Sequence, residues 1–362
     1  MRDKERKIYL PELSTLDAAK RRMAWIFDHY ETIVVSVSGG KDSTVCFELA
    51  HAEAVKRGRK IKCFFLDQEA EYQASIDIVS EYMCRPNVEP YWYQVPVRMT
   101  NATSYAQDML FAWEPGKQWV RDKHPLAIHE CADSPNRFYP FVEWFDNKFG
   151  EGAAHIVGLR SEESLNRFRA VTAHPALPHI NWSTKTASGA VKFYPIYDWS
   201  YEDVWTYFGN HGIRYNRIYD LLWSKQTAIS GMRVSNLIHE KAYESLATLQ
   251  EFEHDTYERL QARLEGVHLA GLYAKEKTIL DAKELPSAFD SWAAYRDFLL
   301  DTAPISDDRK ARFKGRFDRQ ADTPKVHRQQ CRQIALNDWE GSIQIDQTDN
   351  TENTMDKWRE LL

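Results

Sequence analysis

A strand-forming run that leads into two glycines and then a helix limits most strongly what this chain can fold into. Residues 32–37 read T-I-V-V-S-V, a β-branched segment typical of a buried strand. Residues 38–43, S-G-G-K-D-S, follow directly, and residues 43–57 have a helical composition that ends at Gly58. Glycines allow backbone N–H groups to point inward as an anion nest, and the start of a helix adds partial positive charge. This segment therefore predicts a phosphate-binding loop.

The side chains of the loop add charge and hydroxyl groups. Lys41 supplies a full positive charge, while Ser38 and Ser43 supply hydroxyl donors. Asp42, rather than Ser or Thr, follows the lysine, and no glycine stands five residues before Gly40, so this is not a Walker A loop. The alternative interpretation is a plain glycine turn between a strand and a helix.

Strand-like and helix-like segments alternate along the first half of the chain. The pattern predicts strands at residues 32–37, 61–67, 91–97 and 153–158, and helices at residues 16–30, 43–57 and 76–83. Such alternation predicts an α/β fold in which helices flank a parallel sheet, and such sheets bind ligands at the carboxyl ends of their strands. From residue 201 onward the pattern is mainly helical, most clearly at residues 201–208, 217–224 and 240–264.

Length and composition predict two parts and a tail. We expect the 362 residues to divide into a nucleotide-binding domain at 1–230, a helical extension at 231–341 and an acidic, flexible tail at 342–362. No run approaches the roughly 18 apolar residues that a membrane span needs. The charged start of the chain lacks the apolar core of a signal peptide, which favours a cytoplasmic protein.

Three motifs together resemble the PAPS reductase branch of the PP-loop superfamily of ATP pyrophosphatases. Residues 36–43 match S-x-S-G-G-K-D-S. Residues 158–169 are similar to G-x-R-x-x-E-S-x-x-R, and residues 194–205 to P-x-x-D-W-s-x-x-D-V-W, in the same order and spacing. The resemblance covers residues 32–222 and implies the Rossmann-like fold of the adenine nucleotide alpha hydrolases. It also implies ATP or a PAPS-like adenine nucleotide as the ligand, with Mg²⁺.

The resemblance and the position of each residue together give the candidate site. Arg160 follows a strand, where its planar fork can reach a phosphate held by the loop, although an ion pair with Glu162 or Glu163 is the alternative. Asp67 ends the second strand, where it can contact ribose or a metal ion, or cap a helix. The expected nucleotide-binding residues are Ser36, Ser38, Gly39, Gly40, Lys41, Asp42, Ser43, Asp67, Gly158 and Arg160. Lys41 and Arg160 are the expected catalytic residues, and Asp42 and Asp67 the expected magnesium ligands.

The third motif also has a purely structural interpretation. In it, Trp199, Trp205 and Tyr207 pack a helix onto the sheet. Residues 200–203, S-Y-E-D, have the form of a capping box that would begin that helix.

Further stretches are similar to the immunoglobulin-binding regulator A type of bacterial and prophage protein. They are residues 326–339 and an aromatic insertion at residues 113–115, 119–121 and 139–141. This similarity implies a ParB-like protein partner.

The cysteines depart from the reductase pattern. PAPS reductases carry their catalytic cysteine in an E-C-G-x-H element, which this chain lacks, and Cys331 stands in a different context. The D/E-T-G element after the second strand is also altered, to D-Q-E at residues 67–69. These departures disfavour reduction of PAPS. His124, His129 and Cys131 leave a metal site open, without an evident fourth ligand.

Three functions remain open at the level of the sequence. The first is an enzyme that adenylates an acceptor and releases AMP and pyrophosphate as products. The second is a nucleotide-responsive regulatory protein that acts with a ParB-like partner or nucleic acid, without turnover. The third, ranked last, is a sulfonucleotide reductase. A basic island is a candidate nucleic-acid contact, although interleaved aspartates favour a solvated helix face; it comprises Arg309, Lys310, Arg312, Lys314, Arg316, Arg319, Lys325, Arg328 and Arg332.

Overall fold

The structure is a computed structural model that describes most of the chain. The described residues are 13–100, 109–172, 175–177, 180–186, 189–234, 236–238, 243–264, 266–267, 284–335, 337–339, 341 and 343–347. They group into two compact units, one within residues 1–99, 111–237 and 251–259, the other within residues 100–110, 238–250 and 260–362.

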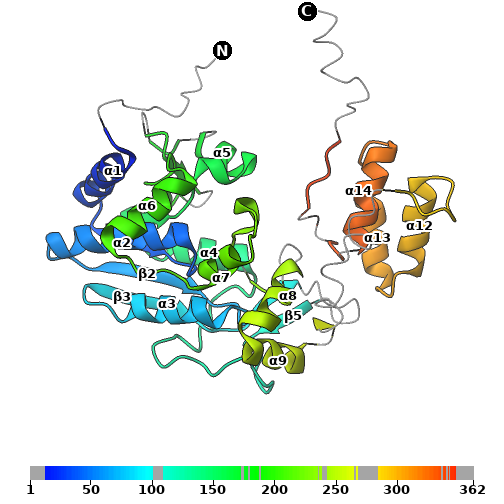
Figure 1. The fold of residues 1–362 in the computed structure, drawn as a ribbon, viewed down its shortest axis with the longest axis horizontal. Coiled ribbons are helices and arrows are strands. Elements are labelled where there is room, and N and C mark those ends of the chain that lie inside the picture. The colour runs from blue at the N-terminus through cyan, green and yellow to red at the C-terminus, as the bar shows by residue number, and fades with distance from the viewer. Residues whose placement is uncertain are drawn as a thin grey trace, which may run out of the picture. The chain divides into compact units, whose positions relative to one another are not determined.

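A six-stranded sheet organises the first unit (Figure 1). Its strand order is β3-β2-β1-β6-β8-β7, and all neighbouring pairs are parallel except β7 with β8. The strands are β1 (Thr32–Ser36), β2 (Ile61–Leu66), β3 (Val88–Tyr93), β6 (Ala153–Val157), β7 (Ser183–Lys185) and β8 (Val191–Phe193). Two further strands are β4 (Val97–Thr100) and β5 (Met109–Ala112). The expected α/β fold with a mostly parallel sheet is confirmed, and the antiparallel edge strand β7 is an addition to it.

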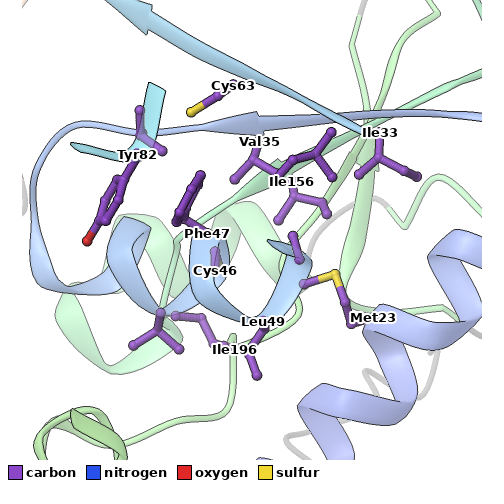
Figure 2. Packing of buried hydrophobic residues seen from close by; sticks show 14 of the residues in the cluster. Met23, Ile33, Val35, Cys46, Phe47, Leu49, Cys63, Tyr82, Ile156 and Ile196 are labelled. Atoms are coloured by element: carbon purple, nitrogen blue, oxygen red, sulfur yellow. The ribbon is translucent and has the colours of Figure 1, made fainter. Parts of the chain in front are cut away.

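Alternation along the strands divides the core into two layers. Ile33 and Val35 of β1 face a layer formed with several helices, whose packing Figure 2 shows. Val34 lies between them in sequence and points to the opposite face, where Phe141 and Phe145 cover it. The first layer includes residues of α1 (Thr15–His29), α2 (Lys41–Lys56), α3 (Gln73–Met83) and α6 (Tyr201–His211), and the second includes residues of α4 (Phe138–Asn147). The sheet is therefore covered on both faces.

Two expected elements differ from the structure. The strand predicted at residues 91–97 ends earlier, at Tyr93, because the backbone N–H of Gln94 bonds to the Ile128 carbonyl instead of continuing the pairing with β2. The single helix predicted at residues 240–264 is two helices, which are interrupted at Glu253. At this interruption, the Glu253 carboxylate accepts hydrogen bonds from the backbone N–H groups of Gln73 and Ala74, the first two residues of α3.

Short helices complete the first unit, and three helices form the core of the second. The short elements of the first unit are η1 (Ser161–Glu163), α5 (Leu165–Thr172), α7 (Ile218–Ser224) and η2 (Ile229–Gly231), while α8 (Tyr243–Phe252) and α9 (His254–Arg263) each have residues in both units. The second unit contains α12 (Trp292–Thr302), α13 (Asp307–Phe317) and α14 (Pro324–Ala335), which pack around Phe313, Phe317 and Ile334. The expected helical character of the C-terminal region is confirmed.

Candidate functional site

The candidate site lies where the chain order of the sheet reverses. From β1 the chain builds outward through β2 and β3, and then returns to place β6 on the other side of β1. The last residues of the two strands, Ser36 and Val157, are register partners. The segments that follow them, residues 37–43 and 158–160, therefore leave the carboxyl edge of the sheet side by side. Ligands of open α/β sheets bind at such a switch point.

Gly39 gives the loop its turn. Its φ is +68°, a left-handed conformation that favours glycine, and a Cβ would lie 3.0 Å from the backbone oxygen of Ser75 on α3. Gly40 follows as the N-cap of α2, with an extended backbone and no side-chain cap. The start of α2 therefore depends on groups outside the helix to satisfy its first N–H groups.

The two loop hydroxyls hold the loop together. The Ser43 hydroxyl donates to the Gly40 carbonyl at 2.9 Å and accepts from the Ser38 backbone N–H at 3.2 Å. The Oγ atoms of Ser38 and Ser43 are 3.2 Å apart. Ser38 is exposed, and Ser36 is half-buried at the end of β1.

Lys41 and Arg160 converge on one carboxylate. The Lys41 ammonium is 2.9 Å from one oxygen of Asp42, and Nε of Arg160 is 2.6 Å from the other. Lys41, Asp42 and Arg160 are all buried. Burial lowers the pKa of Lys41, while the neighbouring Asp42 carboxylate raises it. The structure therefore brings together the two cations that the sequence assigned to phosphate.

The alternative interpretation of Arg160 as a surface ion pair accounts for a minor part of its contacts. Nη1 of Arg160 is 3.5 Å from Glu162, whose side chain is 54% exposed, whereas the Arg160 side chain is 4% exposed. Glu163 pairs instead with Arg167. Buried charge pairs interact more strongly than exposed ones, so Asp42 is the main partner of Arg160.

Gly158 is required by packing. A Cβ at this position would lie 2.6 Å from the backbone carbon and oxygen of Asp42 and 2.6 Å from the Ser43 nitrogen. The end of β6 therefore touches the first turn of α2 backbone to backbone. This contact fixes the distance between the loop and Arg160.

Asp67 is fully buried among protein donors. One oxygen accepts from the Glu69 backbone N–H and pairs with Arg121, and the other accepts from Trp92 Nε1 and Gln94 Nε2. The residue does not cap α3, whose N-cap is Tyr72. In this arrangement Asp67 has a structural role in the loop after β2.

The altered D-Q-E element and the aromatic insertion form one feature. The Glu69 carboxylate accepts backbone N–H bonds from Trp113 at 2.6 Å and Val120 at 3.1 Å. Trp113 Nε1 donates to the Asp67 carbonyl at 2.7 Å, and Arg121 donates to the Glu69 carbonyl at 2.5 Å. The glutamate that replaces the glycine of D/E-T-G thus anchors the insertion.

Two residues of the site escaped the sequence analysis. Asn216, just before α7, and Tyr219, within α7, both bond to the phosphate loop. Asn216 Nδ2 donates to the Gly39 carbonyl at 3.1 Å, and the Tyr219 hydroxyl accepts from the Lys41 backbone N–H at 3.0 Å. The sequence signal for this pair is a polar residue within an aromatic stretch, a pattern too common in folded proteins to single out a binding site.

The D-W-S element has structural contacts. Asp198 forms a two-bond ion pair with Arg22 of α1, at 2.7 and 2.6 Å. The buried Trp199 donates from Nε1 to the Thr15 carbonyl at 3.1 Å. Ser200 and Asp203 form the expected capping box at the start of α6.

The described residues contain no group of three or more His, Cys, Asp or Glu side chains arranged to hold a metal ion. His124 stacks on Trp92 and lies 3.1 Å from the Ser80 hydroxyl, while His129 bonds to the His124 carbonyl. In the described part of the chain, these histidines and Cys131 thus have no metal-site geometry.

Cys331 is a buried thiol. It lies on α14, is 5% exposed, and its Sγ is 3.6 Å from the Trp292 carbonyl. Burial raises the pKa of Cys331 to about 12. Because the thiolate is the nucleophile, this environment opposes the chemistry of a reductase cysteine.

Several cations of the basic island pair with acids or the backbone. Arg312 pairs with Asp308, Lys314 with Asp301, and Lys325 with Asp346. The half-buried Arg316 donates to the carbonyls of Trp339 and Asp338. This pairing agrees with a solvated helix face that also stabilises its own unit.

A membrane crossing would need a longer and more apolar helix than any in the described part of the chain.

Solved structures with some likeness include FMN adenylyltransferase of Candida glabrata in complex with FMN and an ATP analogue. That comparison has a TM-score of 0.37 at 14% identity, and covers 64% of this chain and 66% of that one. PAPS reductase of Candida auris, in a phosphate complex, gives a TM-score of 0.30 at 13% identity over 58% of this chain and 92% of that one.

Sequence comparisons are more specific. The uncharacterized protein YbdN of Escherichia coli K12 is 31% identical over 316 residues, which cover 82% of this chain and 77% of that protein. Adenosine 5'-phosphosulfate reductase of Staphylococcus saprophyticus is 23% identical over 205 residues, 56% of this chain and 72% of that enzyme. Residues 227–354 match a domain of unknown function, DUF3440.

Residues 32–246, more than half of the chain, match the phosphoadenosine phosphosulfate reductase domain. The matched region contains the loop, Gly158, Arg160 and the D-W-S element, which confirms the resemblance seen in the three motifs. The chain belongs to the phosphoadenosine phosphosulfate reductase domain family.

Proposed function

We propose that this protein binds ATP or a closely related adenine nucleotide at the loop of residues 36–43, within a nucleotide-binding domain at residues 1–230. The observation that carries this proposal is the convergence of Lys41 and Arg160, from neighbouring strand ends, on the buried Asp42. Two cations beside a glycine turn and the positive end of α2, whose N-cap Gly40 has no side chain, form a cradle for a polyphosphate. Membership of the PAPS reductase domain family supports an adenine nucleotide as the ligand.

The chemistry that fits this cradle is adenylyl transfer. An oxygen of the acceptor attacks the α-phosphorus, the bond from that phosphorus to the bridging oxygen breaks, and pyrophosphate leaves. The acceptor proton passes to solvent, and hydrolysis of the adenylated acceptor then gives AMP. Lys41, Arg160 and the loop N–H groups would stabilise the charge on the transferring and leaving oxygens, a task that needs no protein nucleophile.

Magnesium does not fit the two carboxylates that the sequence suggested. Both oxygens of Asp42 are engaged by cations, and both oxygens of Asp67 accept bonds from protein donors. We therefore assign no step to a metal at Asp42 or Asp67.

Isothermal titration calorimetry with ATP, followed by measurement of AMP and pyrophosphate, tests the proposal. We expect saturable binding of ATP and slow release of both products, which rises when the true acceptor is added. An absence of ATP binding would contradict the proposal. Binding without products would assign the site to the nucleotide-responsive regulatory alternative, whose ParB-like partner could then be tested by the nucleotide dependence of complex formation.

A further inference from the structure

The segment that leads into α7 holds the phosphate loop from outside. Asn216 is 1% exposed, and its Nδ2 donates both to the Gly39 carbonyl and, at 2.9 Å, to the Ser75 hydroxyl. Its Oδ1 accepts the Ile218 backbone N–H at 3.1 Å. The amide thus ties the loop, α3 and the start of α7 together, and so fixes where the side chains of α7 lie.

Tyr219, the second residue of α7, places its hydroxyl at the start of α2. The oxygen accepts the Lys41 backbone N–H, the first donor of that helix, and lies 3.6 Å from where a Cβ of Gly40 would be. The ring meets Trp205 edge-on at 5.5 Å, which limits its rotation. The hydroxyl therefore has a defined position directly beside the loop.

Among the described residues, no acceptor takes the hydroxyl proton of Tyr219. A tyrosine hydroxyl that accepts one hydrogen bond still has its own proton to donate. Within the part of the chain that the structure describes, Tyr219 donates to no acceptor. Burial raises the pKa of Tyr219, so the group stays protonated and remains a donor at physiological pH.

We propose that the Tyr219 hydroxyl is a phosphate-binding group of this site: it accepts the Lys41 N–H and donates its own proton to a phosphoryl oxygen of the bound nucleotide. The inference rests on the proposed nucleotide binding and adds a donor from outside the loop motif. The arrangement extends the positive end of α2 by one hydroxyl group, because the N–H polarises the O–H that it bonds to.

Calorimetry on wild type and Tyr219→Phe with three probes tests this proposal: ATP, inorganic pyrophosphate and adenosine. The phenylalanine keeps the ring and removes only the hydroxyl. Hydrogen bonds to charged groups are among the stronger ones in proteins, so we expect ATP and pyrophosphate to bind about tenfold more weakly or worse. Adenosine, which has no phosphate, should bind both proteins equally.

Tyr194→Phe is the matched control. Tyr194 is also a buried tyrosine, and its hydroxyl bonds to Thr184 on β7 at 2.7 Å. This variant should lose stability as Tyr219→Phe does, but it should bind ATP and pyrophosphate as wild type does. Thermal unfolding of all three proteins shows that each is folded.

The outcomes separate the two proposals. If Tyr219→Phe bound ATP as tightly as wild type or more tightly, the hydroxyl would serve only as acceptor for the Lys41 N–H. This result would overturn the inference and leave the proposed function standing. An equal loss for adenosine and ATP would assign Tyr219 a structural role and overturn it as well. A wild type that binds neither ATP nor pyrophosphate would overturn the proposed function and the inference with it.

Discussion

Gly158 directly follows β6 and packs against the backbone of α2, where a Cβ on it would lie 2.6 Å from backbone atoms of Asp42 and Ser43. Gly158→Ala should therefore force the strand end and the helix apart. Such overpacking typically costs about 1–3 kcal/mol, and we expect a loss of stability of that size or larger in urea unfolding. Gly209→Ala is the control, because Gly209 lies within α6 with open space around it. That change should be neutral or stabilise by up to about 1 kcal/mol. Equal stability of the two variants would refute the close approach at Gly158.

Arg160 is the second residue whose replacement separates two interpretations. Its buried pair with Asp42 depends on the position of a guanidinium, so Arg160→Lys should weaken ATP binding nearly as much as Arg160→Ala. We expect at least a tenfold loss in both by calorimetry. Arg22→Lys, which breaks the two-bond ion pair with Asp198, should lower stability and leave ATP affinity unchanged. Unaltered ATP affinity in both Arg160 variants would remove this residue from the site.

At the scale of elements, the connection after β2 and the aromatic insertion should behave as one unit. Glu69→Gln replaces one carboxylate oxygen with an NH₂ group, which cannot accept the backbone N–H of Trp113 or Val120. An unpaired buried donor costs about 1–3 kcal/mol, so the insertion should open more often. Hydrogen exchange at the two amides should accelerate at least tenfold. The exposed Glu130→Gln should leave exchange as in wild type, and unchanged exchange in Glu69→Gln would contradict the anchor.

The same connection should give the stability a pH dependence. Burial, with a smaller contribution from Asp67, raises the pKa of Glu71 from 4.5 to about 8. The folded state therefore binds a proton that the unfolded state releases, and the stability from this group is complete below about pH 4.5 and is lost as the pH rises to about 8. Glu71→Gln should remove this slope, so the variant should gain stability over wild type between about pH 5 and about pH 8. The free energy of unfolding in urea, measured at both pH values, tests this expectation, and Glu31→Gln, at an exposed position, is the control. Parallel pH profiles for wild type and Glu71→Gln would disprove the assignment.

For the whole molecule, the clearest expectation is an activity that should be absent. Thiol-dependent PAPS reduction needs an activated thiolate that attacks sulfur, whereas Cys331 is buried in α14 with a raised pKa. We expect no sulfite from PAPS with thioredoxin or glutaredoxin as reductant, even where PAPS binds. A working reductase is the positive control. Sulfite formed by wild type and lost in Cys331→Ser would make Cys331 catalytic, and activity that persists in Cys331→Ser would point to Cys131.

The sequence by itself determined the features whose causes are local. The β-branched run predicted β1, and the glycines predicted a loop between this strand and a helix, in which Gly39 has a positive φ. The residues at the start of α6 predicted its capping box, and alternating segments predicted the parallel sheet. The strand, the loop and the cap follow from the conformational preferences of a few neighbouring residues, and the parallel sheet follows from the alternation of strands and helices along the chain, so the sequence pattern is enough to predict them.

Only the tertiary structure decided how distant groups share the site. Tyr219 reaches the amide of Lys41 across 178 positions of the chain, and Arg160 reaches Asp42 across 118. Asp67 looked available at a strand end, but the insertion that covers it is held by Glu69, and this commits its carboxylate to protein donors. Such outcomes have no local signature, because burial and the pairing of buried polar groups depend on which segments the complete sheet brings together.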